Sequence, residues 1–443
     1  MNDVRGAVEI VMPGVVEDLQ QLVAIPSVSS LPEHDGDVAR CAAEVQRLLE
    51  DAGCPGVRLL EAGGKPAVYG HFPAPEGAPT VLLYAHYDVQ PTGERAAWTA
   101  EPFRATERDG RLFGRGTADD KGGLAVHLAA LRAFQGKPPV GVKVFVEGEE
   151  EIGSPSMPAL LDAFADELSA DIYVIADSVN WEVGTPSLTT SLRGTVDAEV
   201  TVSTLATGLH SGQFGGVVPD ALTALCRLLA TLHDEHGNVA VGGLLGSDEA
   251  SVEYPEDRLR EETGVLDGVQ WIGTGSLAAR MWTKPAATVL AIDATPVRDA
   301  SNTLTPTARA KVSLRLAPGD DAHRAAQALE KHLRDHAEWG VRVEVAHGQA
   351  ASGSELAMTD ERAGAAIAAF AQAFGTEPVQ IGCGGSIPIV AEFAARNPGA
   401  LVLVTAVVDP TSRMHGIDES VDLSDLARAA VAEALLLDGL SRL

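Results

Sequence analysis

The sequence has few basic residues and no long uncharged apolar run. Its 33 Lys and Arg are outnumbered by 62 Asp and Glu, which gives a net charge of -29 at pH 7. Such a charge repels nucleic-acid backbones and anionic membranes, and no charge-free apolar stretch reaches the roughly 18 residues of a membrane span. The first 22 residues place acids among apolar residues, which predicts an amphipathic helix rather than an export signal. We therefore expect a cytoplasmic protein with no nucleic-acid or membrane partner.

Cysteine is also scarce. The four cysteines, Cys41, Cys54, Cys226 and Cys383, lie far apart and form no CxxC pair. This usage is typical of reduced thiols in a protein interior and argues against a disulfide framework.

What the chain does have is enough length and apolar content for two domains. It has 443 residues, of which 45% are hydrophobic, and one core rarely serves so long a chain. The apolar runs VLLYA, VKVFV and IYVIA lead into His86, Glu147 and Asp177, with helical stretches between them. Continuous apolar strands predict an α/β domain whose sheet is covered on both faces, with ligands beyond the carboxyl ends of its strands.

The pattern of apolar and polar residues changes from about Ser191. The segment GTVDAEVTVST alternates like a half-exposed strand, and two later strand-like segments are separated by amphipathic helices. Near Ser352 the first pattern returns, with a helix and the buried strand ALVLVTAVV. The sequence therefore predicts a first domain built from residues 1–190 and 353–443, with an α+β domain of residues 191–352 inserted into it.

One helix is predicted immediately after the polar turn TADDKGG. Leu124, Leu128 and Leu131 recur there at helical spacing. His127 lies within this helix, and we expect it at the surface or at the boundary of the core.

The segment YAHYDVQP carries the first candidate site residues. In an extended backbone His86 and Asp88 point to the same side. A neutral imidazole is a good zinc ligand, and a nearby carboxylate can orient its ring through the other nitrogen. A structural or surface pair fits the same two residues.

The segment GRGTADDKGG places Asp119 and Asp120 directly before the predicted helix. One carboxylate has two oxygens and can bridge two metal ions, which is a common device for activating a shared water. An aspartate at this place can equally cap the helix and interact with its dipole.

The segment VEGEEEIGSP carries four glutamates, Glu147, Glu149, Glu150 and Glu151, behind an apolar strand. Carboxylates this close repel one another unless cations offset them. Neighbouring glutamates at a metal site can divide the work, one as ligand and one as proton carrier. A solvated acidic loop is the alternative.

Asp177 and His415 complete the set. Asp177 follows IYVIA, and His415 lies in SRMHGIDES after the last buried strand. With the earlier residues they supply two histidines and several carboxylates, a nitrogen and oxygen ligand set that suits hydrolytic zinc better than a thiolate site would.

Taken in order, these segments resemble the aminoacylase, carnosinase and bacterial carboxypeptidase family of co-catalytic zinc peptidases. The resemblance spans nearly the whole chain and includes HxD, GRGTADDKGG, paired glutamates before GS, the strand-end aspartate, LHSG, GGSIP and the late histidine. It implies a zinc-exopeptidase catalytic domain, with a mixed and mostly parallel sheet between helices, and an inserted ferredoxin-like domain that serves as lid and dimerisation surface.

The resemblance also implies roles at the metal site. His86 and Asp177 would hold one zinc ion, Glu151 and His415 the other, and Asp119 would bridge them. Glu150 would be the general base, and Asp88 would support His86. Cobalt or manganese could replace zinc in such a site. A cis peptide bond between Asp119 and Asp120 is also expected.

On the inserted domain, His210 in TGLHSGQFGG resembles a histidine that reaches the active site of a neighbouring subunit, although Gly208 replaces the acid often found two positions earlier. Asn302 and Arg315 resemble contacts to the substrate carboxylate, for which a guanidinium is suited. Gly385 and Ser386 in GGSIP resemble a backbone site for the same group. Because His210 would reach a neighbouring subunit, the resemblance also implies a homodimer formed through the inserted domain.

The dipeptidase branch is the nearest resemblance, so the predicted function is hydrolysis of dipeptides or short peptides. Some dipeptidases carry a charged residue where Gly382 and Cys383 stand here. An N-acyl or N-succinyl amino acid deacylase using the same metals is the alternative enzyme. A non-catalytic dimeric binding protein is the alternative from another class.

Overall fold

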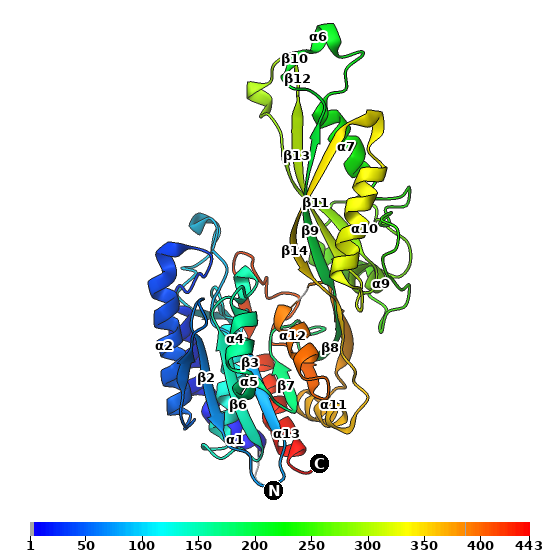
Figure 1. The fold of residues 1–443 in the computed structure, drawn as a ribbon. Coiled ribbons are helices and arrows are strands. Elements are labelled where there is room, and N and C mark those ends of the chain that lie inside the picture. Colours follow the sequence, from blue (N-terminus) through cyan, green and yellow to red (C-terminus); the bar gives the residue numbers. More distant parts are fainter. Residues whose placement is uncertain (1–3, 386) are drawn as a thin grey trace. The chain divides into compact units, whose positions relative to one another are not determined.

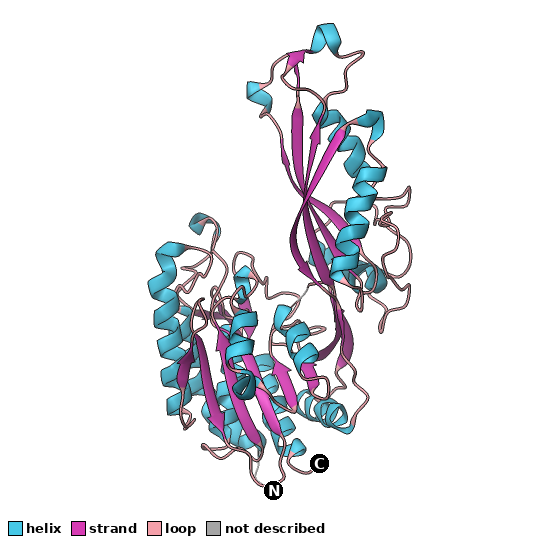
Figure 2. Cartoon of the chain, in the orientation of Figure 1, coloured by secondary structure: helices cyan, strands magenta, loops and turns pink. Residues whose placement is uncertain are grey.

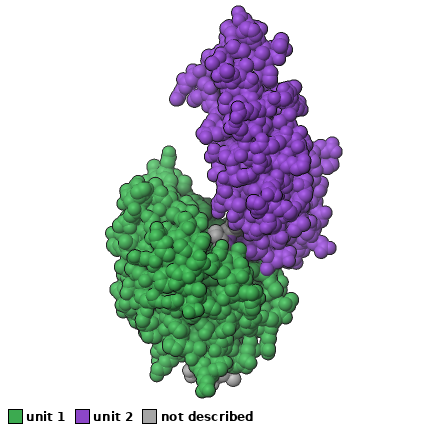
Figure 3. Space-filling view, viewed as in Figure 1, with its two compact units in different colours: residues 1–190, 356–381, 388–443 green, residues 191–355, 382–387 purple. Residues whose placement is uncertain are grey.

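The computed structural model describes residues 4–385 and 387–443 (Figure 1). The chain forms two compact units (Figure 3). The first unit holds the residues up to Thr190 together with Leu356–Ile381 and Pro388–Leu443, and the second holds Ser191–Glu355 and Gly382–Ile387. The short segment Gly382–Ile387, which lies in the sequence range expected to rejoin the first domain, therefore groups with the second unit.

A mixed sheet of nine strands lies mostly in the first unit, and its edge strand Ser354–Glu355 belongs to the second (Figure 2). Its order is β1-β2-β6-β3-β7-β17-β8-β15, and β16 also pairs with β8. The central strands β6, β3, β7 and β17 are parallel, and the outer pairs are antiparallel. The strands are β1 Arg58–Leu60, β2 Ala67–Phe72, β3 Thr80–His86, β6 Gly141–Glu147, β7 Ile172–Ile175, β8 Ser187–Leu192, β15 Ser354–Glu355, β16 Val379–Cys383 and β17 Leu401–Val404.

Helices cover both faces of this sheet (Figure 2). They are α1 Val4–Val23, α2 Asp35–Asp51, α3 Lys121–Ala133, α4 Met157–Ala163, α5 Ala165–Leu168, α11 Glu361–Phe374, α12 Pro388–Arg396 and α13 Leu423–Leu440. A small separate sheet joins β4 Thr106–Arg108, β5 Arg111–Phe113 and β18 Ser420–Asp422. The expected amphipathic N-terminal helix is α1, which buries Val8, Val15 and Leu19. None of the helices in the described part of the chain is long and apolar enough to cross a membrane.

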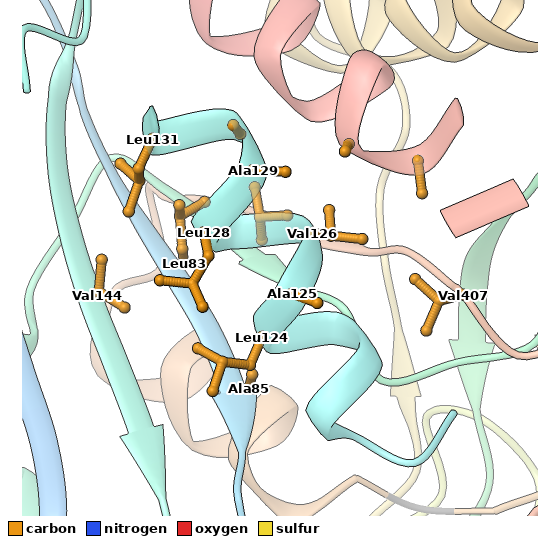
Figure 4. Close-up of a cluster of buried hydrophobic side chains, with 14 of the residues drawn as sticks. Leu83, Ala85, Leu124, Ala125, Val126, Leu128, Ala129, Leu131, Val144 and Val407 are labelled. Atoms are coloured by element: carbon orange, nitrogen blue, oxygen red, sulfur yellow. The ribbon is translucent and has the colours of Figure 1, made fainter. Parts of the chain in front are cut away.

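Helix α3 lies in the centre of the core (Figure 4). Leu124, Leu128 and Leu131 are fully buried and belong to one hydrophobic cluster with Leu83 of β3 and Val144 of β6 (Figure 4), so the predicted helical face is confirmed. The expectation that His127 lies at the surface or at the boundary of the core was wrong, because α3 packs against α1 and α13 as well as β3 and buries this residue fully. Its Nδ1 lies 2.8 Å from a carboxylate oxygen of Glu433, which compensates for burying the ring.

The cysteines are all unpaired thiols. Cys41 and Cys54 are buried, as expected, and Cys383 is half-buried. Cys226 is exposed, so the interior prediction was wrong for this residue. It lies on a helix that turns Leu225 and Leu229 towards the core, and position 226 falls on the opposite face.

The second unit is built on a four-stranded antiparallel sheet of order β11-β13-β9-β14. The two principal helices, α7 and α10, pack on this sheet, and chain order is β9-α7-β11-β13-α10-β14. Alternate residues of β9, among them Val196, Val200 and Val202, are buried, as the alternation in the sequence predicts. The elements are β9 Gly194–Ser203, β10 Leu209–His210, α6 Ser211–Phe214, α7 Ala221–Ala230, α8 Glu256–Thr263, α9 Leu277–Trp282, β11 Ala286–Asp293, β12 Thr303–Leu304, β13 Thr307–Leu316, α10 Ala322–Asp335 and β14 Arg342–Ala351.

Candidate metal centre

The parallel strands bring the candidate residues of the first unit to one edge of the sheet. His86 is the last residue of β3 and lies opposite Glu147 at the end of β6. Asp177 follows the end of β7, which pairs with β3 on its other side. Since these strands run in the same direction, the polar residues that follow them collect at their carboxyl ends.

Six side chains at this edge form two groups. One group is His86, Glu150 and Asp177, and the other is Asp119, Glu151 and His415, with the ligand atoms of each group within 4.8 Å of one another. Three nitrogen or oxygen donors at such spacing can hold a metal ion. The structure thus brings together all five predicted metal ligands and Glu150.

Asp119 lies between the two histidines. Its Oδ1 is 3.1 Å from Nε2 of His86, and its Oδ2 is 2.9 Å from Nε2 of His415. One oxygen therefore faces each group, as a bridging ligand requires. The predicted cis bond between Asp119 and Asp120 is confirmed. Asp120 stands at the cap position of α3, but its side chain makes no cap hydrogen bond.

Asp88 connects both halves of the centre. Its backbone carbonyl lies 3.0 Å from Nδ1 of His86, and its Oδ1 lies 3.4 Å from the same nitrogen. The same carboxylate accepts hydrogen bonds from the backbone N–H of Glu150 at 3.2 Å and of Glu151 at 3.1 Å. Asp88 therefore orients the imidazole and fixes the turn that carries both glutamates.

The four glutamates after β6 have different surroundings. Glu147 accepts a hydrogen bond from the Tyr84 hydroxyl at 2.6 Å. Glu149 accepts hydrogen bonds from the backbone N–H of Lys65 and from Ser156. Of these four, Glu150 and Glu151 belong to the two ligand groups, whereas Glu147 and Glu149 form hydrogen bonds that hold the local structure.

Sequence reasoning missed a buried pair that supports the centre, Arg115 and Glu419. The Glu419 carboxylate accepts hydrogen bonds from the backbone N–H of Gly116, Ala118 and Asp119 at 3.0–3.1 Å, and from Nη1 of Arg115 at 2.5 Å. Nη2 of Arg115 donates to the carbonyl of His415 at 3.1 Å. The pair thus fixes the turns that carry Asp119 and His415 relative to each other. Both residues lie inside quoted motifs, GRGTADDKGG and SRMHGIDES, but an isolated arginine or glutamate gives no sign of its partner.

Gln90 was missed as well. Its side-chain amide donates to Oε2 of Glu151 at 2.8 Å, and its backbone N–H donates to Oε1 at 3.0 Å. These bonds hold the Glu151 carboxylate in place. Its position in YAHYDVQP, four residues after His86, is the only sequence signal.

The electrostatics of the centre reflect crowded carboxylates. Burial, reinforced by the negative charges of Glu151 and Asp119, raises the pKa of Glu150 to about 7. Burial also raises the pKa of Asp177 well above its ordinary value. Hydrogen bonds with Asp119 and Glu151 raise the pKa of His415 to about 10. Burial would raise the pKa of Asp119, but hydrogen bonds from the two imidazoles outweigh it and hold that pKa below its usual range.

These residues fit a pair of divalent cations. The donors are imidazole nitrogens and carboxylate oxygens, without thiolates, and the acids outnumber the basic groups around them. Carboxylates resist ionisation in such surroundings, and bound cations would remove that cost.

The remaining predicted residues belong to the second unit. His210 is exposed on β10, opposite Thr303 of β12, and the adjacent Asn302 accepts a hydrogen bond from the Ser211 N–H through its carbonyl at 2.9 Å. Arg315 is half-buried on β13, and Gly385 follows β16. Ser386 lies outside the described residues. A role in substrate binding or catalysis stays a prediction for all five of these residues: His210, Asn302, Arg315, Gly385 and Ser386.

Gly382 stands where some dipeptidases carry a charged residue, and the surrounding structure leaves no room for a side chain at this position. A Cβ atom at this position would lie 2.5 Å from the Cβ of Trp282. The Trp282 ring thus leaves room only for glycine there.

An α/β sheet with paired histidine and carboxylate groups at its carboxyl edge is the architecture of a metal-dependent hydrolase. The family comparison agrees with this class, because the model of peptidase family M20/M25/M40 matches residues 82–438. The chain belongs to this family and is a metallopeptidase.

Known relatives cover almost the whole chain. The cysteinylglycine-S-conjugate dipeptidase of Corynebacterium striatum is 37% identical over 434 residues, which are 96% of this chain and 94% of the relative. The human Beta-Ala-His dipeptidase is 27% identical over 426 residues, which are 88% of this chain and 83% of the relative. The solved structure of the di-peptidase Dug1p from Saccharomyces cerevisiae has a TM-score of 0.85 at 23% identity, and covers 99% of this chain and 98% of that one. This structural likeness confirms the mixed α/β fold with its mostly parallel central sheet.

Proposed function

We propose that this protein hydrolyses dipeptides or short peptides with two zinc ions and Glu150 as general base. The position of Asp119, with one oxygen towards each histidine, carries this proposal. The relatives described above support the substrate class, because two similar sequences and one similar structure are those of dipeptidases.

In the proposed arrangement His86 and Asp177 would hold one ion, Glu151 and His415 would hold the other, and Asp119 would be shared by both. When bound, the two cations would supply an activated water as the nucleophile and would stabilise the charge that develops on the amide oxygen. Zinc suits this donor set, and cobalt or manganese can occupy it as well.

Glu150 is proposed to move the proton. Burial raises its pKa to about 7 in the absence of cations, and a carboxylate beside the attacking water can act as the proton carrier. It takes a proton from the attacking water and delivers it to the nitrogen of the leaving amine. Because Glu150 lies within reach of His86 and Asp177, direct metal ligation is the competing role.

A substrate panel tests the proposed function. We expect the zinc-loaded protein to hydrolyse unblocked dipeptides and to leave N-acetyl and N-succinyl amino acids intact. Release of free amino acids can be followed by chromatography, with chelator-treated protein as the control. Hydrolysis of the acylated compounds alone would replace the proposal with a deacylase using the same metals.

We further propose that residues 191–352 form an inserted ferredoxin-like domain that acts as lid and dimerisation surface. Its βαββαβ order supports the ferredoxin-like assignment. Strand β11 lies at the edge of the sheet and exposes 38% of Val289, 55% of Leu290 and 40% of Ile292. An apolar edge strand offers unpaired backbone groups to a second copy of the chain. In the homodimer His210 would serve the partner's site, while Asn302, Arg315, Gly385 and Ser386 would bind substrate.

Replacing Leu290 with lysine should convert the dimer into a monomer, because the new charge would be buried when two β11 edges meet. Light scattering coupled to size-exclusion chromatography measures the mass directly. Ile10, which is 80% exposed on α1, provides the matched Ile10→Lys control and should leave the dimer intact. A wild-type protein of monomer mass would contradict this proposal.

We also propose a cytoplasmic location, which the four unpaired thiols support because reduced cysteines are usual in that compartment.

A further inference from the structure

The second unit contains a buried arginine that has no acidic partner. Arg193 is 6% exposed, and its Nε has no hydrogen-bond partner. Its Nη2 donates to the backbone carbonyl of Arg280. No carboxylate forms an ion pair with Arg193 among the residues that the structure describes. Burying a charge without a counter-ion costs free energy, so a bound anion would stabilise a guanidinium in this position.

A second arginine lies near it. Arg315 pairs with Thr195 across β13 and β9, and Arg193 lies immediately before β9, two residues from Thr195, which brings the two arginines to the same end of the sheet. Burial, together with the positive charge of Arg315, lowers the pKa of Arg193 to about 10, as expected for neighbouring cations. In the described part of the chain, Arg315 too has no hydrogen bond or ion pair through its side chain. Two neighbouring arginines without an acid are unusual in a chain with 62 acids and 33 basic residues.

The glycine-rich loop of the second unit lies beside this pair. The backbone N–H of Arg193 donates to the carbonyl of Cys383 at 3.1 Å. Burial raises the pKa of the Cys383 thiol, and the charges of Arg315 and Arg193 oppose that shift, so the thiol lies near both guanidiniums. Gly384 and Gly385 follow directly. Small residues allow a ligand to approach the backbone closely.

We propose that Arg193, together with Arg315, binds the C-terminal carboxylate of the substrate and so restricts the enzyme to peptides with a free C-terminus. This inference rests on the proposed peptidase function and names a specificity-determining residue for it. A planar guanidinium binds a carboxylate through two parallel hydrogen bonds. A dipeptide with uncharged side chains has a single carboxylate, at its C-terminus. A C-terminal amide lacks that negative charge, so the two arginines would bind the free dipeptide more tightly than its amide.

Calorimetry with the zinc-loaded, full-length protein tests this inference. The probes are two reduced-amide analogues of Ala-Gly, in which a methylene replaces the scissile carbonyl: one ends in a carboxylate and the other in a carboxamide. We expect Arg193→Met to weaken binding of the carboxylate probe about 10- to 100-fold and to leave the carboxamide probe unaffected. Arg193→Lys should retain part of the selectivity and guards against a folding defect in the methionine variant. Arg309→Met is the control, because Arg309 lies on β13 with Arg315 but pairs with Asp293.

Two results would overturn the inference. Equal weakening for both probes would mean that Arg193 only supports the backbone at Arg280, and unchanged binding in both Arg193 variants would mean that no anion is held there. Hydrolysis of Ala-Gly is measured in parallel, where Arg193→Lys should raise KM with little change in kcat. A wild-type protein that hydrolyses no peptide refutes the proposed function itself, whereas active variants with unchanged probe selectivity refute only the role of Arg193.

Discussion

Replacing Glu150 with glutamine should lower kcat for dipeptide hydrolysis by about 10²- to 10⁴-fold, the usual contribution of a positioned general base. Glutamine has nearly the shape of glutamate but cannot accept a proton from water. The backbone N–H of residue 150 would still donate to Asp88, so the turn that also carries Glu151 should keep its position. Initial rates give kcat, and elemental analysis after dialysis should still find two metal ions per chain.

Glu149→Gln is the matched control for this prediction. Glu149 belongs to the same acidic run but binds the Lys65 N–H and Ser156, away from the two ligand groups. Its variant should keep nearly the wild-type kcat. Unchanged turnover in Glu150→Gln would refute the base assignment. Loss of a metal ion in that variant would instead assign Glu150 as a ligand beside His86 and Asp177.

The central elements of the fold were predictable because their patterns are strong. Continuous apolar runs predicted the strands that end near His86, Glu147 and Asp177, and parallel strands place such ends together. The spacing of Leu124 and Leu128 predicted α3 for the same reason. The division of the ligands into two groups came from the family resemblance, and the structure places the same residues together.

Other features depended on contacts that no local pattern contains. His127 is buried because α3 is enclosed by two further helices, and Glu433, its partner, comes from α13. Glu419 lies 304 residues from Arg115, with which it pairs. A single sequence cannot show which buried charges meet across such a distance. The ligands of the metal centre were therefore predicted, but the Arg115–Glu419 pair that supports them was not.

Replacing Asp119 with asparagine should have the largest effect on metal binding. Asparagine keeps one carbonyl oxygen but lacks the negative charge and the second oxygen that now face His86 and His415. Loss of a supporting residue alone costs about 10- to 100-fold in metal affinity, so loss of a shared ligand should exceed that range at both positions. Zinc titration by calorimetry measures the affinities, and elemental analysis after dialysis measures how many ions remain.

Comparison with two further variants shows whether Asp119 truly serves both ions. His415→Ala removes a ligand from one group only, so it should weaken one ion and spare the other. Glu419→Gln leaves every ligand in place but removes the charge that holds the Asp119 turn, and should fall within the milder range of a supporting residue. Asp51→Asn, on the exposed side of α2, should bind two ions like the wild type. If Asp119→Asn instead lost one ion and kept the other at wild-type affinity, Asp119 would belong to a single metal, and the two-metal centre would need another shared ligand.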